Sequence, residues 1–149
     1  MNVLHVVLVL GHVVVAAAWF GIGLRLPSLS RAILAAPPDV REALRRHGDK
    51  TIREMTGMSV VFYALALAAF FVGGGFSAYG PVYHAALGLG LVLVLLHAFG
   101  TRPTWRRFAD GDDALRGRFG GLLGLSHGLW LALLVLMFFG PRWSSAWGV

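Results

Sequence analysis

The chain of 149 residues contains no cysteine. This absence excludes disulfide bonds, metal sites with thiolate ligands and haem attached covalently through cysteine. A bound metal would therefore need histidine, methionine, carboxylate or backbone oxygen as its ligands. Charged residues are also scarce, because they make up 13% of the chain, about half the share of a typical soluble domain.

Charge is missing altogether from four long apolar segments. Residues 3–24, 57–76, 82–99 and 119–140 contain no Asp, Glu, Lys or Arg, and each is long enough to cross a bilayer as a helix. Apolar residues make up 57% of the chain, and its mean hydropathy is +0.71. These features predict an all-α integral membrane protein, with a single domain over residues 1–149 folded as an up-down four-helix bundle.

Several other signals are missing as well. The four segments hold no carboxylate and no nucleophile–base pair is evident, which argues against hydrolysis. No glycine-rich phosphate-binding motif followed by Lys-Ser or Lys-Thr occurs. No Lys or Arg precedes the first segment, so we expect a retained membrane span and not a signal peptide.

The thirteen Lys and Arg residues are distributed unevenly. Seven lie between Arg25 and Arg53 and five between Arg102 and Arg118, whereas the Ser77–Pro81 turn has none. Because the first and third loops of a four-span protein lie on the same side, the positive-inside rule predicts that this side is cytoplasmic and that both termini face outward. The net charge of +6 is therefore explained by basic cytoplasmic loops of a protein in a prokaryotic-type inner membrane. The expected partner is the lipid bilayer and not nucleic acid.

The first loop is predicted to contain a short interfacial helix. Pro37-Pro38 ends one element, and Val40, Leu44 and His47 then recur at helical spacing among arginines. This pattern is typical of a basic amphipathic helix on the inner leaflet. Gly48 is expected to separate that helix from the second span.

The histidines are the main candidates for chemistry. An imidazole inside a bilayer marks a metal, a haem, a proton path or a bond to a neighbouring helix. With about 1.5 Å of rise per residue, His5 and His84 lie near the outer surface, His12 about 13 Å below it, and His97 and His127 both about 20 Å below it. Two layers are therefore predicted: His97 with His127, and His12 with His5 or His84. A pairing of His12 with His97 or His127 stays open.

Small residues surround the deeper histidines. Gly90 shares a helical face with His97, and Gly124 borders His127. A flat porphyrin needs the backbone to retreat where its face and edges meet a helix. Histidines on two facing helices, flanked by glycine, therefore favour a haem between the spans.

The fourth span also carries a row of glycines, Gly120, Gly124 and Gly128. Small residues four apart allow close packing of membrane helices. This face is accordingly a candidate contact for a second copy of the chain or for a membrane redox partner.

The first and third spans resemble those of a known family. Leu10-Gly11-His12, Trp19-Phe20 and Leu26-Pro27 are similar to the first span of the HemJ family, the membrane protoporphyrinogen IX oxidases, and of the related CopD-type copper-resistance proteins. That family has a histidine, a tryptophan seven residues later, a glycine-containing stretch and Leu-Pro-Arg. Its third span has His-Ala-Lys and a histidine eleven residues after the lysine, which corresponds to His84 to His97 here. The resemblance implies b-type haem binding at His12.

Two positions depart from the family pattern. The lysine of the third span falls on Ala86, and the arginine after Leu-Pro falls on Ser28. Haem binding would survive both changes, whereas the oxidase activity would not be expected to. The resemblance thus favours a relative that keeps the haem pocket for electron transfer or as a subunit of a larger complex.

Three functions remain open. The first is a b-type haem protein of electron transfer or redox chemistry, with His12, His97 and His127 as candidate iron ligands. The second is a copper-handling protein like CopD, in which Met55-x-x-Met58 would supply soft ligands to Cu(I). The third is a structural subunit without a cofactor, whose histidines bond neighbouring helices. The candidate cofactor site comprises His12, His97, His127, His84, Trp19, Gly90 and Gly124.

Overall fold

The computed structural model describes residues 2–146, with side chains as far as Phe139, and the regular elements in this part of the chain are all helical. The long helices are α1 (Val3–Gly23), α3 (Pro38–Val72), α4 (Pro81–Leu95) and α6 (Arg116–Ala146). The shorter elements are α2 (Leu26–Ala35), η1 (Gly75–Ser77), the π-helical η2 (Leu96–Thr101), α5 (Arg102–Ala109) and η3 (Asp113–Leu115).

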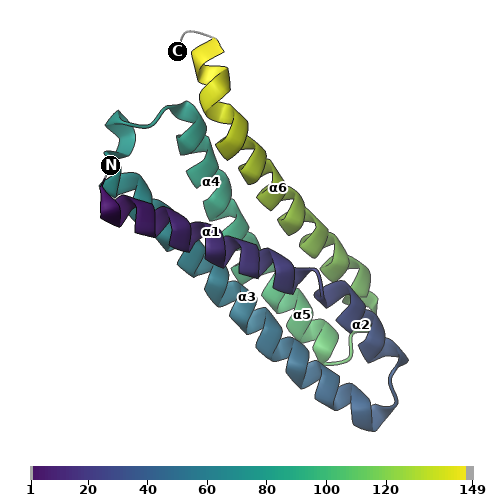
Figure 1. Cartoon of the computed structure of the whole chain (residues 1–149). Coiled ribbons are helices and arrows are strands. Elements are labelled where there is room, and N and C mark those ends of the chain that lie inside the picture. Colours follow the sequence, from purple (N-terminus) through teal and green to yellow (C-terminus); the bar gives the residue numbers. More distant parts are fainter. Residues whose placement is uncertain (1, 147–149) are drawn as a thin grey trace.

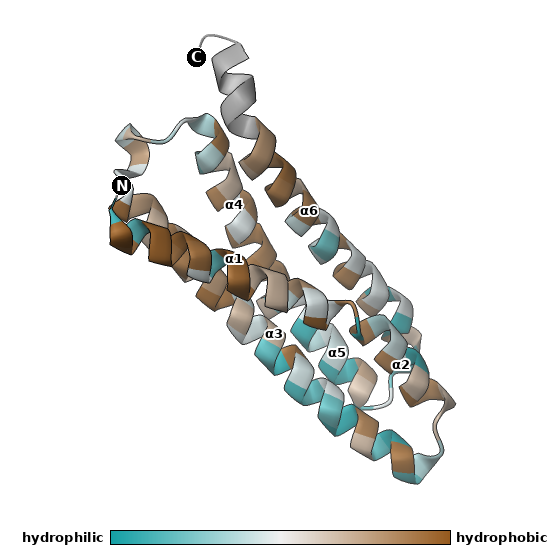
Figure 2. Ribbon diagram, viewed as in Figure 1, coloured by the Kyte–Doolittle hydropathy of each residue, from teal (hydrophilic) through white to brown (hydrophobic). Residues whose placement is uncertain are grey.

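Four helical stretches are long and apolar enough to cross a membrane: Val3–Ala35, Pro38–Val72, Pro81–Ala109 and Asp113–Phe139. The side chains of Val3, Phe99 and Phe138 are 78%, 78% and 72% exposed, as expected where a helix faces lipid. Figure 2 shows the apolar residues concentrated along α1 and the adjoining parts of the other long helices. The prediction of an all-α, multi-pass membrane protein is therefore confirmed.

The helices associate chiefly in two pairs, α1 with α3 and α4 with α6 (Figure 1). Contacts of α3 with α4 and α5 join the pairs into one bundle. The turn between α3 and α4 contains Gly74 at φ 111° and Gly75 at φ 61°, which is backbone geometry that favours glycine. This short, uncharged turn makes α3 and α4 the predicted antiparallel hairpin.

Prolines mark the starts of three helices. Pro27, Pro38 and Pro81 lie in the first turns of α2, α3 and α4, where an N–H would have no partner within the helix. Arg41 Nη2 donates to the carbonyl oxygens of Leu34 and Ala36 at 3.3 and 3.2 Å. This arginine satisfies carbonyls at the end of α2 and so stabilises the sharp reversal into α3.

The predicted boundaries in the first loop are wrong. α3 continues without a break through Gly48, and the short helix of the loop is α2, which lies before the predicted one. Gly48 is buried, and a Cβ at this position would collide with the indole of Trp105 on α5. The glycine therefore permits a close approach of two helices, a role that the periodicity of one helix does not reveal.

The second span is also shorter than predicted at its far end. α3 ends at Val72 with Gly73 as its C-cap, four residues before the predicted end at Phe76. Gly74 and Gly75 have positive φ values that a helix cannot contain. The run of three glycines is thus the start of the turn and not the end of the span.

The third span changes geometry beside a candidate ligand. The helix is α-helical to Leu95 and π-helical over Leu96–Thr101, a segment that contains His97. Pro103 follows, and because its nitrogen carries no hydrogen it cannot donate to the carbonyl of Phe99. A π segment that accommodates this loss within a helix is a feature that occurs frequently at functional sites.

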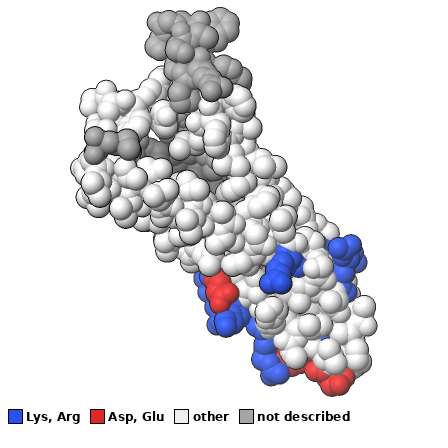
Figure 3. Space-filling model, viewed as in Figure 1, with Lys and Arg blue, Asp and Glu red and all other residues white. Residues whose placement is uncertain are grey.

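Charged side chains gather at one end of the bundle, over α2, α5 and the first half of α3 (Figure 3). Among the side chains that the structure describes, the helical segments before Arg25, between Glu54 and Arg102, and after Arg118 carry no Lys, Arg, Asp or Glu. Arg142 lies beyond these described side chains. The bundle therefore has a charged end and an uncharged end, with the histidines distributed between them.

Candidate functional site

His97 and His127 come together around one tryptophan. His97, in η2, and Trp19, on α1, are both fully buried. The indole centroid of Trp19 lies 5.1 Å from the ring of His97 and 5.7 Å from that of His127 on α6. Three segments that are distant in the sequence thus bring two imidazoles to one indole, and of these rings His97 is fully buried and His127 is partly buried. The predicted depths placed the two histidines in the same layer.

The hydrogen bond of His127 sets its tautomer. Its Nδ1 lies 2.7 Å from the carbonyl oxygen of Leu123, and since a carbonyl oxygen only accepts, Nδ1 must donate. The neutral ring then keeps its lone pair on Nε2. That Nε2 is buried and has no hydrogen-bond partner in the described part of the chain. A backbone carbonyl on one nitrogen and a lone pair on the other is the usual arrangement of a metal-binding histidine.

Unpartnered polar atoms are concentrated at this point. Within residues 2–139, both ring nitrogens of His97, Nε1 of Trp19 and Oγ1 of Thr101 are buried without a hydrogen-bond partner. Each such group costs about 1–3 kcal/mol of stability when it is left unsatisfied. The other buried polar atoms without partners in this part of the chain are His84 Nε2 and the Nε atoms of Arg41, Arg45 and Arg102. Buried polar atoms without partners are rare in native proteins, so His97 and His127 are candidates for a functional site.

Gly23 and Met55 form the wall opposite His127. A Cβ on Gly23 would lie 2.7 Å from His127 Nε2 and 2.9 Å from Met55 Cε. The two side chains therefore meet at the same small space, and Met55 is fully buried. The site offers two imidazoles and a neighbouring thioether.

The ligand set is small. Among the described residues, no group of three or more His, Asp or Glu side chains is arranged to hold a metal ion. A structural zinc site needs four protein ligands and a catalytic one needs three. The described residues at this point therefore offer at most two imidazoles and one thioether as candidate ligands.

The histidines on α1 are engaged differently. His5 Nδ1 donates to the carbonyl oxygen of Ala69 at 3.0 Å, and His12 Nδ1 donates to that of Phe62 at 2.8 Å. The donors are seven residues apart on α1 and the acceptors are seven apart on α3. Both imidazoles thus bond the facing helix in one antiparallel register, which is the structural role expected of intramembrane histidines that have no cofactor.

His84 belongs to an aromatic cluster at the uncharged end of the bundle. Its ring lies 5.8 Å from that of Phe70 and 5.0 Å from that of Phe76. Phe70 in turn stacks on Tyr79, whose hydroxyl lies 3.4 Å from His5 Nε2. His5 and His84 therefore border the same cluster, well separated from His97 and His127.

A line of ring contacts connects the two histidine layers. The ring of His12 lies 5.9 Å from Phe62, which lies 6.0 Å from Trp19. Trp19 then contacts His97 and His127. Phe62 and Trp19 thus stand between His12 and the inner pair, and no direct ring contact joins His12 to that pair among the described residues.

The glycines expected to make room for a porphyrin lie elsewhere. A Cβ on Gly90 would lie 3.1 Å from the ring of Tyr63, so Gly90 permits close packing of α4 on α3. Gly124 is exposed, and a Cβ there would meet open space. Neither glycine borders the Nε2 atom of His127, whereas Gly23, which the sequence analysis did not single out, does.

A signal for Gly23 was present in the sequence. It follows Trp19 by four residues, so the two share a helical face. The proximity of Met55 to His127 had no comparable signal, because it depends on how α3 sits against α6 across the end of α1.

Comparison with known proteins adds no relative: no protein-family model, no curated protein and no solved structure matches this chain. The strongest feature of its own geometry is a contrast among the histidines. His5 and His12 bond carbonyls of a facing helix, whereas His127 bonds only within its own helix and His97 has no partner on either ring nitrogen in the described residues.

Proposed function

We propose that this multi-pass membrane protein carries a redox-active metal centre ligated by His97 and His127 and acts in electron transfer or redox chemistry. The observation that carries the proposal is the cluster of buried imidazole nitrogens without partners. Bonds to a metal would use these lone pairs, and Leu123 already holds His127 in the tautomer that a metal requires.

A b-type haem is the first candidate for the centre. Haem iron takes four ligands from the porphyrin and needs at most two from the protein, which suits a pair of imidazoles on packed helices. The resemblance to the HemJ family supports the same cofactor, with His12 as a further candidate ligand. A bound haem would supply reversible one-electron transfer, while the chain would orient it and exclude water. Because the Trp19 indole contacts both rings, a porphyrin bound between them would take the place of this indole.

Copper is a second candidate, and the position of Met55 favours it. Its Cε and His127 Nε2 lie 2.9 and 2.7 Å from one point over Gly23. Thioether and imidazole are ligands that suit Cu(I). A compact ion at this point would leave Trp19 in place, so the closed packing of the site supports a copper-handling role like that of the CopD type.

A spectrum combined with metal analysis tests the proposal. The protein purified in detergent from cells replete in haem and copper should show a Soret band, and on reduction the sharp α and β bands of a six-coordinate b-haem. Bound copper without a Soret band would instead establish the second candidate. A folded, helical protein with neither metal would overturn the proposal. It would favour a structural subunit whose histidines bond neighbouring helices.

We further propose that the chain carries electrons and is not a protoporphyrinogen oxidase. That reaction requires cations for the propionates of the substrate, and Ala86, at the position of the family's lysine, lies on the buried face of α4. The chain should complement an oxidase-deficient strain poorly, and Ala86→Lys should improve it only at a cost in stability. Full complementation by the unmodified chain would refute the carrier proposal.

For its orientation we propose that the charged end is cytoplasmic and that both termini lie outside the inner membrane, as the positive-inside rule implies. A reporter fused after Val149 should be active only outside the cytoplasm. A tag inserted between residues 37 and 46 should be inaccessible from that side. The opposite pattern would show that the charged end lies outside the cytoplasm and would overturn the proposed orientation.

The partner surface that we propose is the glycine face of α6. Gly120, Gly124 and Gly128 are exposed, and a Cβ on any of them would meet open space. A second copy of the chain, or a redox partner, could approach this face closely. Cross-linking in membranes should detect the contact and Gly124→Leu should weaken it; unchanged cross-linking in that variant would rule this face out.

A further inference from the structure

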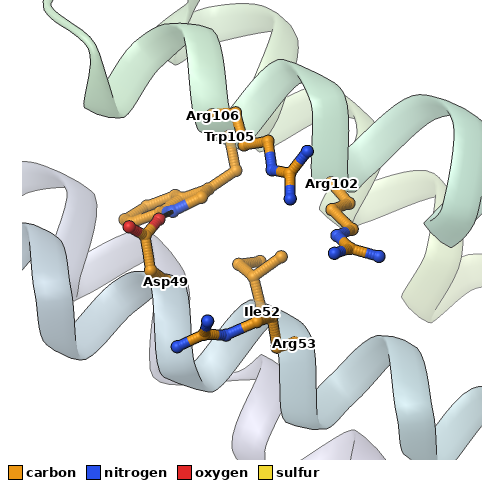
Figure 4. Close-up of a pocket in the computed structure, with 6 residues that line it drawn as sticks. All are labelled: Asp49, Ile52, Arg53, Arg102, Trp105 and Arg106. Carbon is orange, nitrogen blue, oxygen red and sulfur yellow. Dashed lines mark hydrogen bonds between the residues drawn. The ribbon is translucent and has the colours of Figure 1, made fainter.

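A small cavity lies between α3 and α5 at the charged end of the bundle. Its volume is about 80 Å³, and its lining consists of Asp49, Ile52, Arg53, Arg102, Trp105 and Arg106. Figure 4 shows Arg106 extending from α5 toward Ile52, with Arg102 beside it on the same helix and Asp49 and Arg53 on α3. Three guanidinium groups from two helices thus surround one space, apart from the histidine site.

The charge around this cavity is not balanced. In the described part of the chain, ion pairs form at Arg46–Glu42, Lys50–Glu54 and Arg107–Asp112, and none involves an arginine of the cavity. The one carboxylate in the lining, Asp49, accepts a hydrogen bond from Trp105 Nε1 at 2.6 Å. Three positive charges therefore face a single negative charge that already has a partner.

One of these arginines is also unsatisfied. Arg102 is partly buried, and its Nε has no hydrogen-bond partner among the described residues. A guanidinium group is never deprotonated in proteins and offers five N–H donors. The buried N–H of Arg102 therefore favours an anionic acceptor.

The walls of the cavity are built into the core. Ile52 and Trp105 are each 1% exposed, and Gly48 admits the Trp105 indole against α3, where any Cβ would collide with it. The spacing of α3 and α5 is consequently set by close packing. Such support fixes the separation of the two helices that carry the arginines, of which Arg102 is partly buried and Arg53 and Arg106 are exposed.

The depth of the cavity matches the level of the lipid headgroups. Arg53 precedes the charge-free run of the second span, which starts at residue 57, by about 6 Å of helix rise, and Arg102 follows the end of the third, at residue 99, by about 4.5 Å. Both distances place the guanidinium groups just outside the hydrocarbon layer. Phosphate groups of phospholipids lie at this level.

We propose that this cavity binds the phosphate group of an anionic phospholipid from the leaflet at the charged end of the bundle. Arginine forms charge-assisted, bidentate bonds with phosphate, and basic pockets between membrane helices bind anionic headgroups. A single water molecule needs about 10–15 Å³ of such space, so the cavity of about 80 Å³ has room for one phosphate group. The lipid would bridge α3 and α5 and so fix the charged end of the bundle in its leaflet.

Native mass spectrometry of the full chain tests the site, with phosphatidylglycerol and phosphatidylcholine as probes. The unmodified chain should retain phosphatidylglycerol in preference to phosphatidylcholine. Arg102→Gln and Arg106→Gln should each lower the affinity for phosphatidylglycerol about tenfold, as expected for the loss of a charge-assisted bond. Arg107→Gln is the matched control, since Arg107 lies on the same helix, carries the same charge and pairs with the exposed Asp112.

Thermal unfolding in detergent separates the two sources of phosphate. Phosphatidylglycerol should raise the unfolding temperature of the unmodified chain and of Arg107→Gln, but not that of Arg102→Gln. If inorganic phosphate gives the full shift and the lipid gives none, the occupant is a soluble anion and the lipid assignment is overturned. Equal retention of phosphatidylglycerol by all the variants would show that only general surface charge is involved and would overturn the site itself.

Discussion

Two pairs of histidines in the same apolar bundle differ in their hydrogen bonds. His5 and His12 each donate to a carbonyl of the facing helix α3. His97, in contrast, has no partner for either nitrogen, and His127 bonds only Leu123 of its own helix and leaves Nε2 without a partner in the described structure. The first pair thus stabilises the contact of α1 with α3, while the second pair lowers stability. A buried polar group that costs stability persists where function requires it, so the comparison favours His97 and His127 over His5 and His12 as the proposed ligands.

The two pairs of histidines also differ in the backbone and side chains around them. The first pair lies at an interface of two regular helices, α1 and α3, and its rings are partly buried, as is that of His127. The second pair lies where α1, the π segment and α6 meet, around a fully buried tryptophan. Irregular backbone thus occurs together with a fully buried histidine and a fully buried tryptophan at the inner pair, as expected of a metal centre that must exclude water.

The largest effect should come from His97→Leu. This substitution removes a proposed ligand, so the amount of bound haem or copper should fall at least tenfold. In the metal-free protein, however, leucine removes two unpartnered nitrogens, and the free energy of unfolding should stay unchanged or rise. Metal content and denaturant unfolding in detergent would measure the two effects. Normal metal content in His97→Leu would show that His97 is not a ligand and would overturn the distinction between the two pairs.

Gly23→Ala should have the next largest effect. Its Cβ would press on His127 Nε2 and Met55 Cε, which should lower the free energy of unfolding by about 1–3 kcal/mol and weaken metal binding. Gly21→Ala is the control on the same helix, because a Cβ there has nothing within 4 Å. Equal behaviour of the two variants in unfolding and metal analysis would show that the wall opposite His127 is not closed.

The smallest effect should come from His12→Leu, which removes one bond between helices. Such bonds contribute about 0.6 kcal/mol in membrane proteins, so the free energy of unfolding should fall by about that amount while the metal content stays unchanged. The outer layer would then affect stability alone, whereas the inner layer would affect metal binding. Loss of the metal in His12→Leu, with its retention in His97→Leu, would transfer the centre to the outer layer, where the resemblance to the HemJ family places a haem ligand.

The sequence by itself determined the membrane class, the number of spans and the level of each histidine. These properties follow from position along the chain and do not depend on how the helices pack. A charge-free run of sufficient length forms a spanning helix, and the rise per residue sets the depth of each residue along it. His97 and His127 could therefore be assigned to one layer before their helices were placed. The charged end could likewise be predicted, since Lys and Arg cluster between the first and second spans and between the third and fourth.

Only the tertiary structure decided what each histidine does, because a nitrogen's partner depends on the rotation and separation of packed helices. The carbonyls of Ala69 and Phe62 became acceptors through the register of α1 on α3, and no pattern in either helix specifies that register. For the same reason Gly48 accommodates an indole and does not end a helix, and Gly90 packs on Tyr63. Arg53 and Arg102, 49 positions apart, line one cavity because Trp105 fills the space that Gly48 leaves between α3 and α5.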